Sequence, residues 1–474
     1  MTRHRILKTV GLGALVYAAG CSDSLYDIQN TNAPTVEQLT GSPNRAILAR
    51  AALGIAAQAS NDLGGEITFY AIFGREGYNL NGNDPRLTQE MIRGPLEAGG
   101  FGGANFGGKY ISIRTINSYL AAVDNAADLT AAEKSGSKGY AKTIEALHLF
   151  RVILRNGALG APVDVQGGLD EEPAPFLSQA NVYARIVTLL DEARSDLAAG
   201  GAAFPFSTPP GFEIAGTPAD FIKFNRALLA KVQVHRATLA GGGNAAYQGA
   251  LAALAESFVS TTASMATGVY YSFGAAAGEP NNPISEGLST LRYFVHPSYR
   301  ADAQLKTGGA RDDRFTSKVQ PFPDGSRTVG NLTGSDKPVM FNTPGTYAAD
   351  LGADIGIIRN EELLLLRAEA NWFAGSKASA LSDLNLVRTT AGGLPASTLT
   401  TASTDDQFVT ALIYERRYSL MWESGTRWID ARRFGKKSTL PVDRSGDVVF
   451  DNMLVPGSEC DARKLTVPCT PPTQ

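Results

Sequence analysis

Apolar side chains recur at helical spacing in a series of long segments of this 474-residue chain. Within each segment they fall near positions i, i+3, i+4 and i+7, which places them on one face of an α-helix. A helix with one apolar face must bury that face against a neighbour, so the pattern predicts a mainly α-helical fold. The predicted helices are residues 36–59, 110–127, 131–155, 180–199, 218–239, 247–258, 359–373, 378–389 and 405–434.

Two of these segments, 359–373 and 378–389, follow each other closely and have small side chains on their apolar faces. Small side chains let two helices approach closely, which predicts stacked helical hairpins in a tetratricopeptide-like scaffold, although no strict repeat of that motif's length is present. The small residues are Ala368, Ala370, Ala374 and Ala380.

Long stretches rich in Gly, Pro, Asn and Asp separate the helices. Loops of this length inside a compact domain are usually functional or contain irregular small structure. We therefore expect a helical scaffold with one loop-rich face. The stretches are residues 64–108, 160–175, 200–216, 270–282 and 307–352.

The N-terminus has the pattern of an export signal. Basic residues precede a short apolar run, residues 10–19, which is about half of the roughly 20 residues that a membrane span needs. Small residues then lead to Cys21, and the segment resembles a bacterial lipoprotein signal in which that cysteine is acylated, although Ala18 stands where leucine is usual. We predict a signal peptide at 1–20 and a tether at 21–34. The alternative is an ordinary secretory signal with an incidental cysteine.

Composition excludes several functional classes. The net charge is −3 and no long basic run is present, which argues against nucleic acid as the main partner. His148, His235 and His296 are widely separated, so we expect no histidine-based metal site or catalytic triad. Residues 103–110 nearly match a phosphate loop, but Tyr110 replaces the Ser or Thr that holds magnesium. We predict a flexible glycine-rich loop there, and neither a cofactor nor a metal.

The two remaining cysteines, Cys460 and Cys469, are nine residues apart near the C-terminus. In an exported protein such a pair indicates a disulfide that closes a small loop, with a stabilisation of about 2–3 kcal/mol. The alternative, a metal site, lacks the CxxC spacing and a neighbouring histidine.

The C-terminal third contains two recognisable segments. Residues 357–370 read IIRNEELLLLRAEA and are followed by LNLVR at 384–388 and AGGL at 391–394; residues 413–436 read IYERRYSLMWESGTRWIDARRFGK. These segments resemble the two signatures of the SusD/RagB family of nutrient-uptake outer-membrane lipoproteins. Weaker echoes of the family occur in order at residues 110–123, 144–162, 224–236 and 312–314. The departures are Ser419 for Glu, an inserted Ser424 and Ala431 for Leu.

The resemblance implies a single SusD-like helical domain at residues 35–474, an α/α superhelix whose signature region spans about 357–436. It implies a lipid-anchored protein, exposed at the surface of the outer membrane, that binds oligosaccharides or peptides. Its partner would be a SusC-like TonB-dependent transporter, to which it passes the ligand without chemical change.

The charge-rich segment at 413–436 has a structural interpretation. Glu423 and Arg427 are one turn apart and Asp430 and Arg433 are three residues apart, so ion pairs can follow one side of a helix. Catalysis by Glu415 and Glu423 is disfavoured, because eight residues of helix separate them by roughly 12 Å along the axis. The apolar residues expected to face the core are Leu420, Trp422, Trp428 and Phe434.

Aromatic, amide and charged residues gather in two of the predicted loops. Aromatic rings stack on the apolar faces of sugars while polar groups take the hydroxyls, so both groups are candidates for ligand contact. The alternative is that the rings hold the loops onto the helical body. The candidates are Tyr70, Phe73, Arg75, Tyr78, Asn81, Asn83, Asp84, Tyr270, Tyr271 and Tyr293.

Two other functional classes remain open. A secreted glycan-degrading enzyme would have paired carboxylates roughly 5–10 Å apart in a cleft and would release reducing sugar. A helical-repeat scaffold would co-purify with a protein partner and bind no small ligand.

Overall fold

The computed structural model describes residues 39, 41, 43–167, 171–423 and 425–474. The predicted signal peptide (1–20), the tether (21–34) and the lipidation site Cys21 lie outside the described residues. In the described part of the chain, no helix combines the length and apolar character that crossing a bilayer requires.

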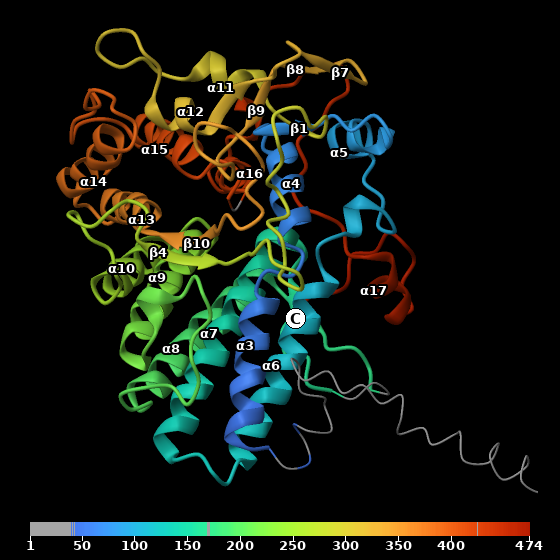
Figure 1. Cartoon of the computed structure of the whole chain (residues 1–474), viewed down its shortest axis with the longest axis vertical. Helices are drawn as coiled ribbons and strands as arrows, with labels where there is room; N and C mark the ends of the chain where they lie inside the picture. The colour runs from blue at the N-terminus through green and yellow to red at the C-terminus, as the bar shows by residue number, and fades with distance from the viewer. Residues whose placement is uncertain (1–38, 40, 42, 168–170, 424) are drawn as a thin grey trace, which may run out of the picture.

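Helices dominate the structure, which confirms the predicted fold class (Figure 1). The long helices pack side by side in the order α6, α7, α8, α9, α10, α13 and α14, and this row forms the scaffold. The helices are α3 (Arg45–Gln58), α4 (Leu63–Phe73), α5 (Glu90–Arg93), α6 (Gly107–Asn125), α7 (Ala131–Asn156), α8 (Gln179–Ala198), α9 (Pro218–Ala237), α10 (Gly243–Ala255), α11 (Pro297–Asp302), α12 (Asp313–Lys318), α13 (Asn360–Phe373), α14 (Lys377–Thr390), α15 (Asp405–Ser419), α16 (Thr426–Arg433) and α17 (Gly457–Ala462).

Short antiparallel strand pairs join the segments between helices. They bring together residues far apart in the sequence, as where β1 binds β5 and β4 binds β10. The strands are β1 (Gly77–Asn79), β2 (Ala161–Pro162), β3 (Phe176–Leu177), β4 (Gly268–Tyr271), β5 (Tyr293–Val295), β6 (Val319–Pro321), β7 (Arg327–Val329), β8 (Leu332–Gly334), β9 (Asp336–Pro338) and β10 (Ile355–Arg359).

Side-chain caps begin several scaffold helices. Thr130 and Glu133 form a reciprocal capping box at the start of α7. At the start of α9 the Thr217 hydroxyl accepts a hydrogen bond from the Asp220 backbone N–H, and Pro218 is the first helical residue, as the sequence predicts. These local signals fix where the scaffold helices start.

The core lies along the row of helices, with a second cluster between the α13–α14 hairpin and α15. In that cluster the ring of Trp372 stacks on Phe408 at a centroid distance of 4.2 Å, and Trp372 Nε1 donates to Asp405. Ala368 and Ala380 are fully buried there, so small side chains allow the close approach that the sequence indicates.

The prediction of one helix over residues 405–434 is wrong, because the chain turns between α15 and α16. Trp422 and Gly425 have φ angles of 55° and 66°, the left-handed region that no continuous α-helix contains. A Cβ at Gly425 would overlap the Cβ of Tyr70, so no side chain fits there. The break therefore redirects α16 so that it packs against α4.

The prediction of a loop over residues 64–108 is also wrong in its first part, where α4 forms. Nearly every residue of α4 from Ile67 onward is buried. A helix surrounded by protein has no polar face, so its sequence lacks the amphipathic spacing by which the other helices were recognised.

Charged residues of the signature region are buried in ion pairs rather than exposed on one helix side. The expected Glu423–Arg427 pair is wrong: Glu423 binds Arg359 at 2.7 Å, and Arg427 donates to the backbone oxygen of Arg75. The Asp430–Arg433 pair is confirmed at 3.4 Å. Leu420, Trp422 and Trp428 are buried as expected, whereas Phe434 is only half-buried.

Candidate functional site

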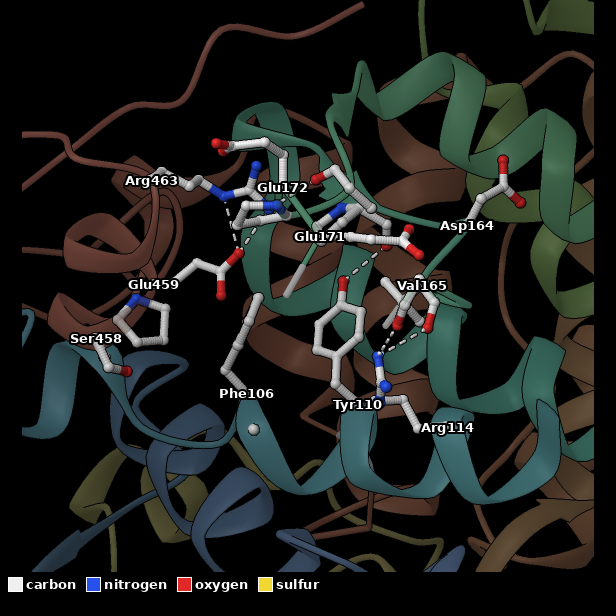
Figure 2. A pocket seen from close by; sticks show the side chains of 17 residues that line it. Phe106, Tyr110, Arg114, Asp164, Val165, Glu171, Glu172, Ser458, Glu459 and Arg463 are labelled. Atoms are coloured by element: carbon white, nitrogen blue, oxygen red, sulfur yellow. Dashed lines mark hydrogen bonds and ion pairs between the residues drawn. The ribbon is translucent and has the colours of Figure 1, made fainter. Parts of the chain in front are cut away.

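A cavity of about 540 Å³ opens where the first turns of α6 meet α17 and the segment between β2 and β3 (Figure 2). We call it the α6 cavity. Its volume lies in the range of sites that hold small molecules. Its described walls come from three distant parts of the chain: residues 103–114, residues 162–167 with 171–174, and residues 456–463.

Two aromatic rings form one side of the α6 cavity. Phe106 directly precedes α6 and Tyr110 lies in its first turn, with their ring centroids 4.7 Å apart. The Tyr110 hydroxyl donates to the backbone oxygen of Pro162 at 2.9 Å, which holds the ring against the opposite wall. Burial raises the pKa of Tyr110 well above its ordinary value, so this hydroxyl stays protonated and keeps donating.

Arg155, at the end of α7, fixes the wall behind these rings. Its guanidinium donates to the backbone oxygens of Ala104 (2.8 Å), Gly102 (3.1 Å) and Leu454 (2.7 Å) and lies 5.3 Å from the centre of the Phe106 ring. Burial lowers the pKa of Arg155 to about 10, which leaves it charged at neutral pH. Arg155 is a positioning residue, because it joins two walls of the cavity without lining it.

Charged and polar groups surround the opening. Arg114 donates to the backbone oxygens of Val165 and Gly167, so its charge is held at one edge. Among the residues that the structure describes, the carboxylates of Asp164 and Glu171 have no hydrogen-bond or ion-pair partner, and both residues are exposed. The cavity thus combines an apolar aromatic face with free hydrogen-bond acceptors.

Helix α17 forms a third wall of the α6 cavity, and the disulfide Cys460–Cys469 ties this helix to the C-terminal segment. This bond confirms the pairing predicted from the sequence. Arg463 binds Glu459 at 2.7 Å and donates to the backbone oxygen of Ala174, so α17 is attached to the segment that precedes β3. The disulfide therefore stabilises a wall of the cavity.

Most of the ligand-contact candidates in the sequence lie in the interior, which corrects the expectation of a ligand-facing loop. Their side chains pack in the core: Tyr70 and Phe73 contact the Trp428 ring, and Arg75 donates to three backbone oxygens. These residues fit the alternative given above, in which the rings hold the loops onto the helical body. The buried candidates are Tyr70, Phe73, Arg75, Tyr78, Tyr271 and Tyr293.

The other candidates in the first loop lie at its surface. Asn83 is exposed, and Asn81 and Asp84 are half-buried. The Asn81 side chain accepts from the Asn83 backbone N–H, and Asp84 binds Arg86 at 2.8 Å. Part of their hydrogen-bonding capacity is therefore used to shape the turn.

Tyr270 and Tyr271 line a smaller cavity of about 230 Å³ beside α3. Tyr270 is half-buried and its hydroxyl donates to the backbone oxygen of Ala266. Tyr271 is buried, with the Arg151 guanidinium 5.7 Å from its ring centre. The structure thus brings two predicted residues together at a concave surface, away from the α6 cavity.

Sequence reasoning missed Phe106, Tyr110 and the α17 residues as parts of one site. A signal was present, because two aromatic residues four apart at the start of a helix lie on one face. Residues 107–110 form the first turn of α6, so the prediction of a flexible loop over 103–110 is wrong there. Lys109 is buried and binds Glu66 at 2.7 Å. Its amino group is therefore paired in the interior and does not have the role of a phosphate-loop lysine.

Within the described ranges, no group of three or more His, Cys, Asp or Glu side chains is placed to hold a metal ion.

Fold and site together define a helical protein with a mixed aromatic and polar cavity at one side of a tetratricopeptide-like scaffold. Residues 340–455 match the family model described as the SusD family. This match confirms the resemblance to the SusD/RagB family seen in the sequence, since it covers both signature segments. No curated protein matches the chain.

Solved structures of this superfamily share the fold over nearly the whole chain. B. fragilis NanU superposes with a TM-score of 0.63 at 16% identity, covering 94% of this chain and 100% of NanU. A SusD homolog from Bacteroides thetaiotaomicron gives 0.66 at 15%, covering 91% and 98%. A laminarin-binding SusD-like protein gives 0.59 at 17%, covering 88% and 98%.

Proposed function

We propose that this protein captures nutrients, foremost oligosaccharides and otherwise peptides, at the surface of the outer membrane and does not transform them. The observation that carries the proposal is the α6 cavity within a SusD-family fold. A ring pair beside unpartnered carboxylates suits a ligand with apolar faces and many hydroxyls. Among the structural neighbours, one is described as laminarin-binding.

The proposal includes the arrangement of the whole chain. Residues 1–20 are a signal peptide, Cys21 is acylated, residues 21–34 form the tether, and residues 35–474 form one domain. Two or more acyl chains hold a protein stably at a membrane, because each buried CH₂ contributes about 0.8 kcal/mol. The tethered protein passes its ligand to a SusC-like TonB-dependent transporter.

Contacts beyond the α6 cavity are also proposed. Tyr270 lines the smaller cavity, and Asn81, Asn83 and Asp84 lie in an accessible loop. These residues are candidates to contact distal parts of a long ligand.

Ligand binding is tested with a glycan and peptide array, followed by calorimetric titration of the best ligand. The Tyr110→Leu variant keeps an apolar side chain but loses the flat ring face. We therefore expect its affinity for the best ligand to fall by about tenfold or more. Ile111→Ala is the matched control, because Ile111 is the next residue of α6, is 63% exposed and does not line the cavity.

The alternative classes predict different results in the same samples. Release of reducing ends from a glycan would favour an enzyme that uses the cavity carboxylates. The absence of binding to every array ligand, together with a co-purifying protein, would favour a scaffold. Equal affinity of Tyr110→Leu and the wild type would remove the α6 cavity from the proposal.

A further inference from the structure

A second cavity, of about 280 Å³, lies at the end of α9, where the ends of α7 and α16 and the first turns of α8 meet. We call it the α9 cavity. It shares no lining residue with the α6 cavity. Its polar side chains include Gln179, Tyr183, His235, Arg432, Arg433 and Asn452.

The charges around the α9 cavity do not balance. Arg433 binds Glu369 at 2.8 Å, and Asp451 is paired with Lys437. Arg432 differs, because no carboxylate among the described residues forms an ion pair with it. Arg432 thus has no direct ion pair among the described residues, although the Asp451 carboxylate also lines the cavity and interacts with it electrostatically.

Arg432 is held in place but most of its donors are unused. Among the described residues it donates a single hydrogen bond, from Nη1 to the backbone oxygen of Leu154 at 2.8 Å, and its guanidinium lies 4.2 Å from the centre of the Trp428 ring. A Cβ at Gly157 would lie 2.5 Å from Nη2, so only a residue without a side chain fits beside that nitrogen. A planar guanidinium with free N–H groups is suited to bind a carboxylate with two hydrogen bonds.

Two further polar groups of the cavity lack partners. His235 is only 7% exposed, and within the described ranges its buried Nδ1 has no hydrogen-bond partner. Tyr183 is also buried and lines the cavity, and its hydroxyl forms no hydrogen bond to another described residue. Burial, followed by the nearby Arg433 and Lys231, lowers the pKa of His235 well below its ordinary value, so the ring is neutral and offers one donor and one acceptor.

We propose that the α9 cavity binds a small hydroxylated carboxylate of the size of a uronic acid. Arg432 pairs with the carboxylate, and His235, Tyr183 and Asn452 bind the hydroxyl groups. The unpartnered buried side chains support a ligand, since buried polar groups in proteins otherwise find partners. This site is independent of the oligosaccharide site proposed above.

Arg432 is a suitable residue to vary, because it is not part of the ion pairs that Arg433 forms with Glu369 of α13 and with Asp430.

The test is calorimetric titration of the full mature protein with sodium glucuronate, with glucose as the uncharged analogue and sodium sulfate as the simple anion. We expect saturable binding of glucuronate, none of glucose at the same concentrations, and weak competition by sulfate. Arg432→Gln should lower the affinity for glucuronate by about tenfold or more, since a charge-assisted hydrogen-bond pair is lost. The exposed Arg50 provides the matched control, and Arg50→Gln should bind as the wild type does.

Several outcomes overturn the proposal. These are a lack of saturable binding by the wild type, equal affinity for glucose, and unchanged binding by Arg432→Gln. If Arg432→Gln does not fold, Tyr183→Phe provides the test, because it keeps the ring and removes only the hydroxyl. We expect the affinity of Tyr183→Phe for glucuronate to be lower by about threefold or more. Unchanged affinity would contradict the proposed site. Weaker glucuronate binding by Tyr110→Leu would place the ligand in the α6 cavity and also contradict it.

Discussion

Glu76 is a carboxylic acid enclosed between α4, α11 and the turn after α15. Its side chain accepts hydrogen bonds from the Tyr299 hydroxyl (3.1 Å) and the Trp422 backbone N–H (3.3 Å), and it is 1% exposed. Arg427, whose charge lowers the pKa of Glu76, donates to the backbone oxygen of Arg75 rather than to this carboxylate. Burial therefore dominates and raises the pKa of Glu76 to about 7.

This shift predicts a pH dependence of stability. Between the unfolded pKa of about 4.3 and the folded value near 7, the folded chain holds the proton and the unfolded chain has lost it. The contribution of Glu76 to the free energy of unfolding should therefore fall as pH rises through that window, by on the order of 3 kcal/mol, and level off above it. The buried His148, His235 and His296 have lowered pKa values and contribute in the opposite direction. Urea denaturation of the wild type and of Glu76→Gln between about pH 5 and pH 8 measures the contribution of Glu76 alone.

Glu76→Gln is the comparison that isolates the effect. Burial also raises the pKa of Glu145 to about 7, so part of the pH dependence should remain in the variant. The difference between wild type and variant should shrink as the pH falls, because wild-type Glu76 then becomes neutral in both states. Parallel stability curves over the whole range would contradict the assignment.

At the scale of elements, the turn between α15 and α16 sets the position of the signature helix. Gly425 has a left-handed backbone and no space for a side chain, because Tyr70 lies against it. Gly435, after α16, also has a left-handed backbone (φ 65°), but no other atom lies within 4 Å of the place that a Cβ would take. Comparing substitutions at the two glycines therefore separates the cost of backbone strain from the cost of a steric clash.

We predict that Gly435→Ala costs about 1 kcal/mol and that Gly425→Ala costs clearly more, about 3 kcal/mol or above. Strain alone acts at Gly435, whereas a clash with the core is added to it at Gly425. Denaturant unfolding of the two variants beside the wild type measures both values. Similar costs at the two positions would mean that α4 and α16 do not pack as described.

The C-terminal element depends on its disulfide. Replacing both cysteines (Cys460→Ser with Cys469→Ser) opens the small loop that holds α17 and should lower the free energy of unfolding by about 2 kcal/mol. Because Glu459 and Arg463 lie on α17 beside the α6 cavity, affinity for the array ligand should fall as well. Stability is measured by denaturation and affinity by calorimetry; a loss of stability with unchanged affinity would show that α17 is not part of the binding site.

How far the sequence predicts these elements depends on what surrounds them. Helices α7, α8 and α9 have one apolar face, so their apolar spacing located them to within a few residues. Helix α4 is enclosed by protein and has no such spacing. The left-handed backbone of Trp422 depends on tertiary packing, which no local pattern reports.

For the whole molecule, the resemblance to the SusD/RagB family could be predicted from the sequence, whereas the site could not. The signature segments are contiguous in sequence, and the family model matches residues 340–455, which contain them. The α6 cavity joins the start of α6 to residues 162–167 and 171–174 and to α17, segments separated by up to several hundred residues. Loop aromatics such as Tyr70 gave a misleading signal, because rings that suit a sugar also suit a core.

The central proposal is that this SusD-like protein is a tethered receptor that serves a transporter. It is tested by purifying the native protein from detergent-solubilised outer membrane and identifying its companions by mass spectrometry. We predict one dominant companion, a TonB-dependent transporter, in about equal amount to the receptor, as a large obligate interface of roughly 2,000 Å² or more would give. Recovery of the protein without any transporter, under conditions that keep other outer-membrane complexes intact, would contradict the claim.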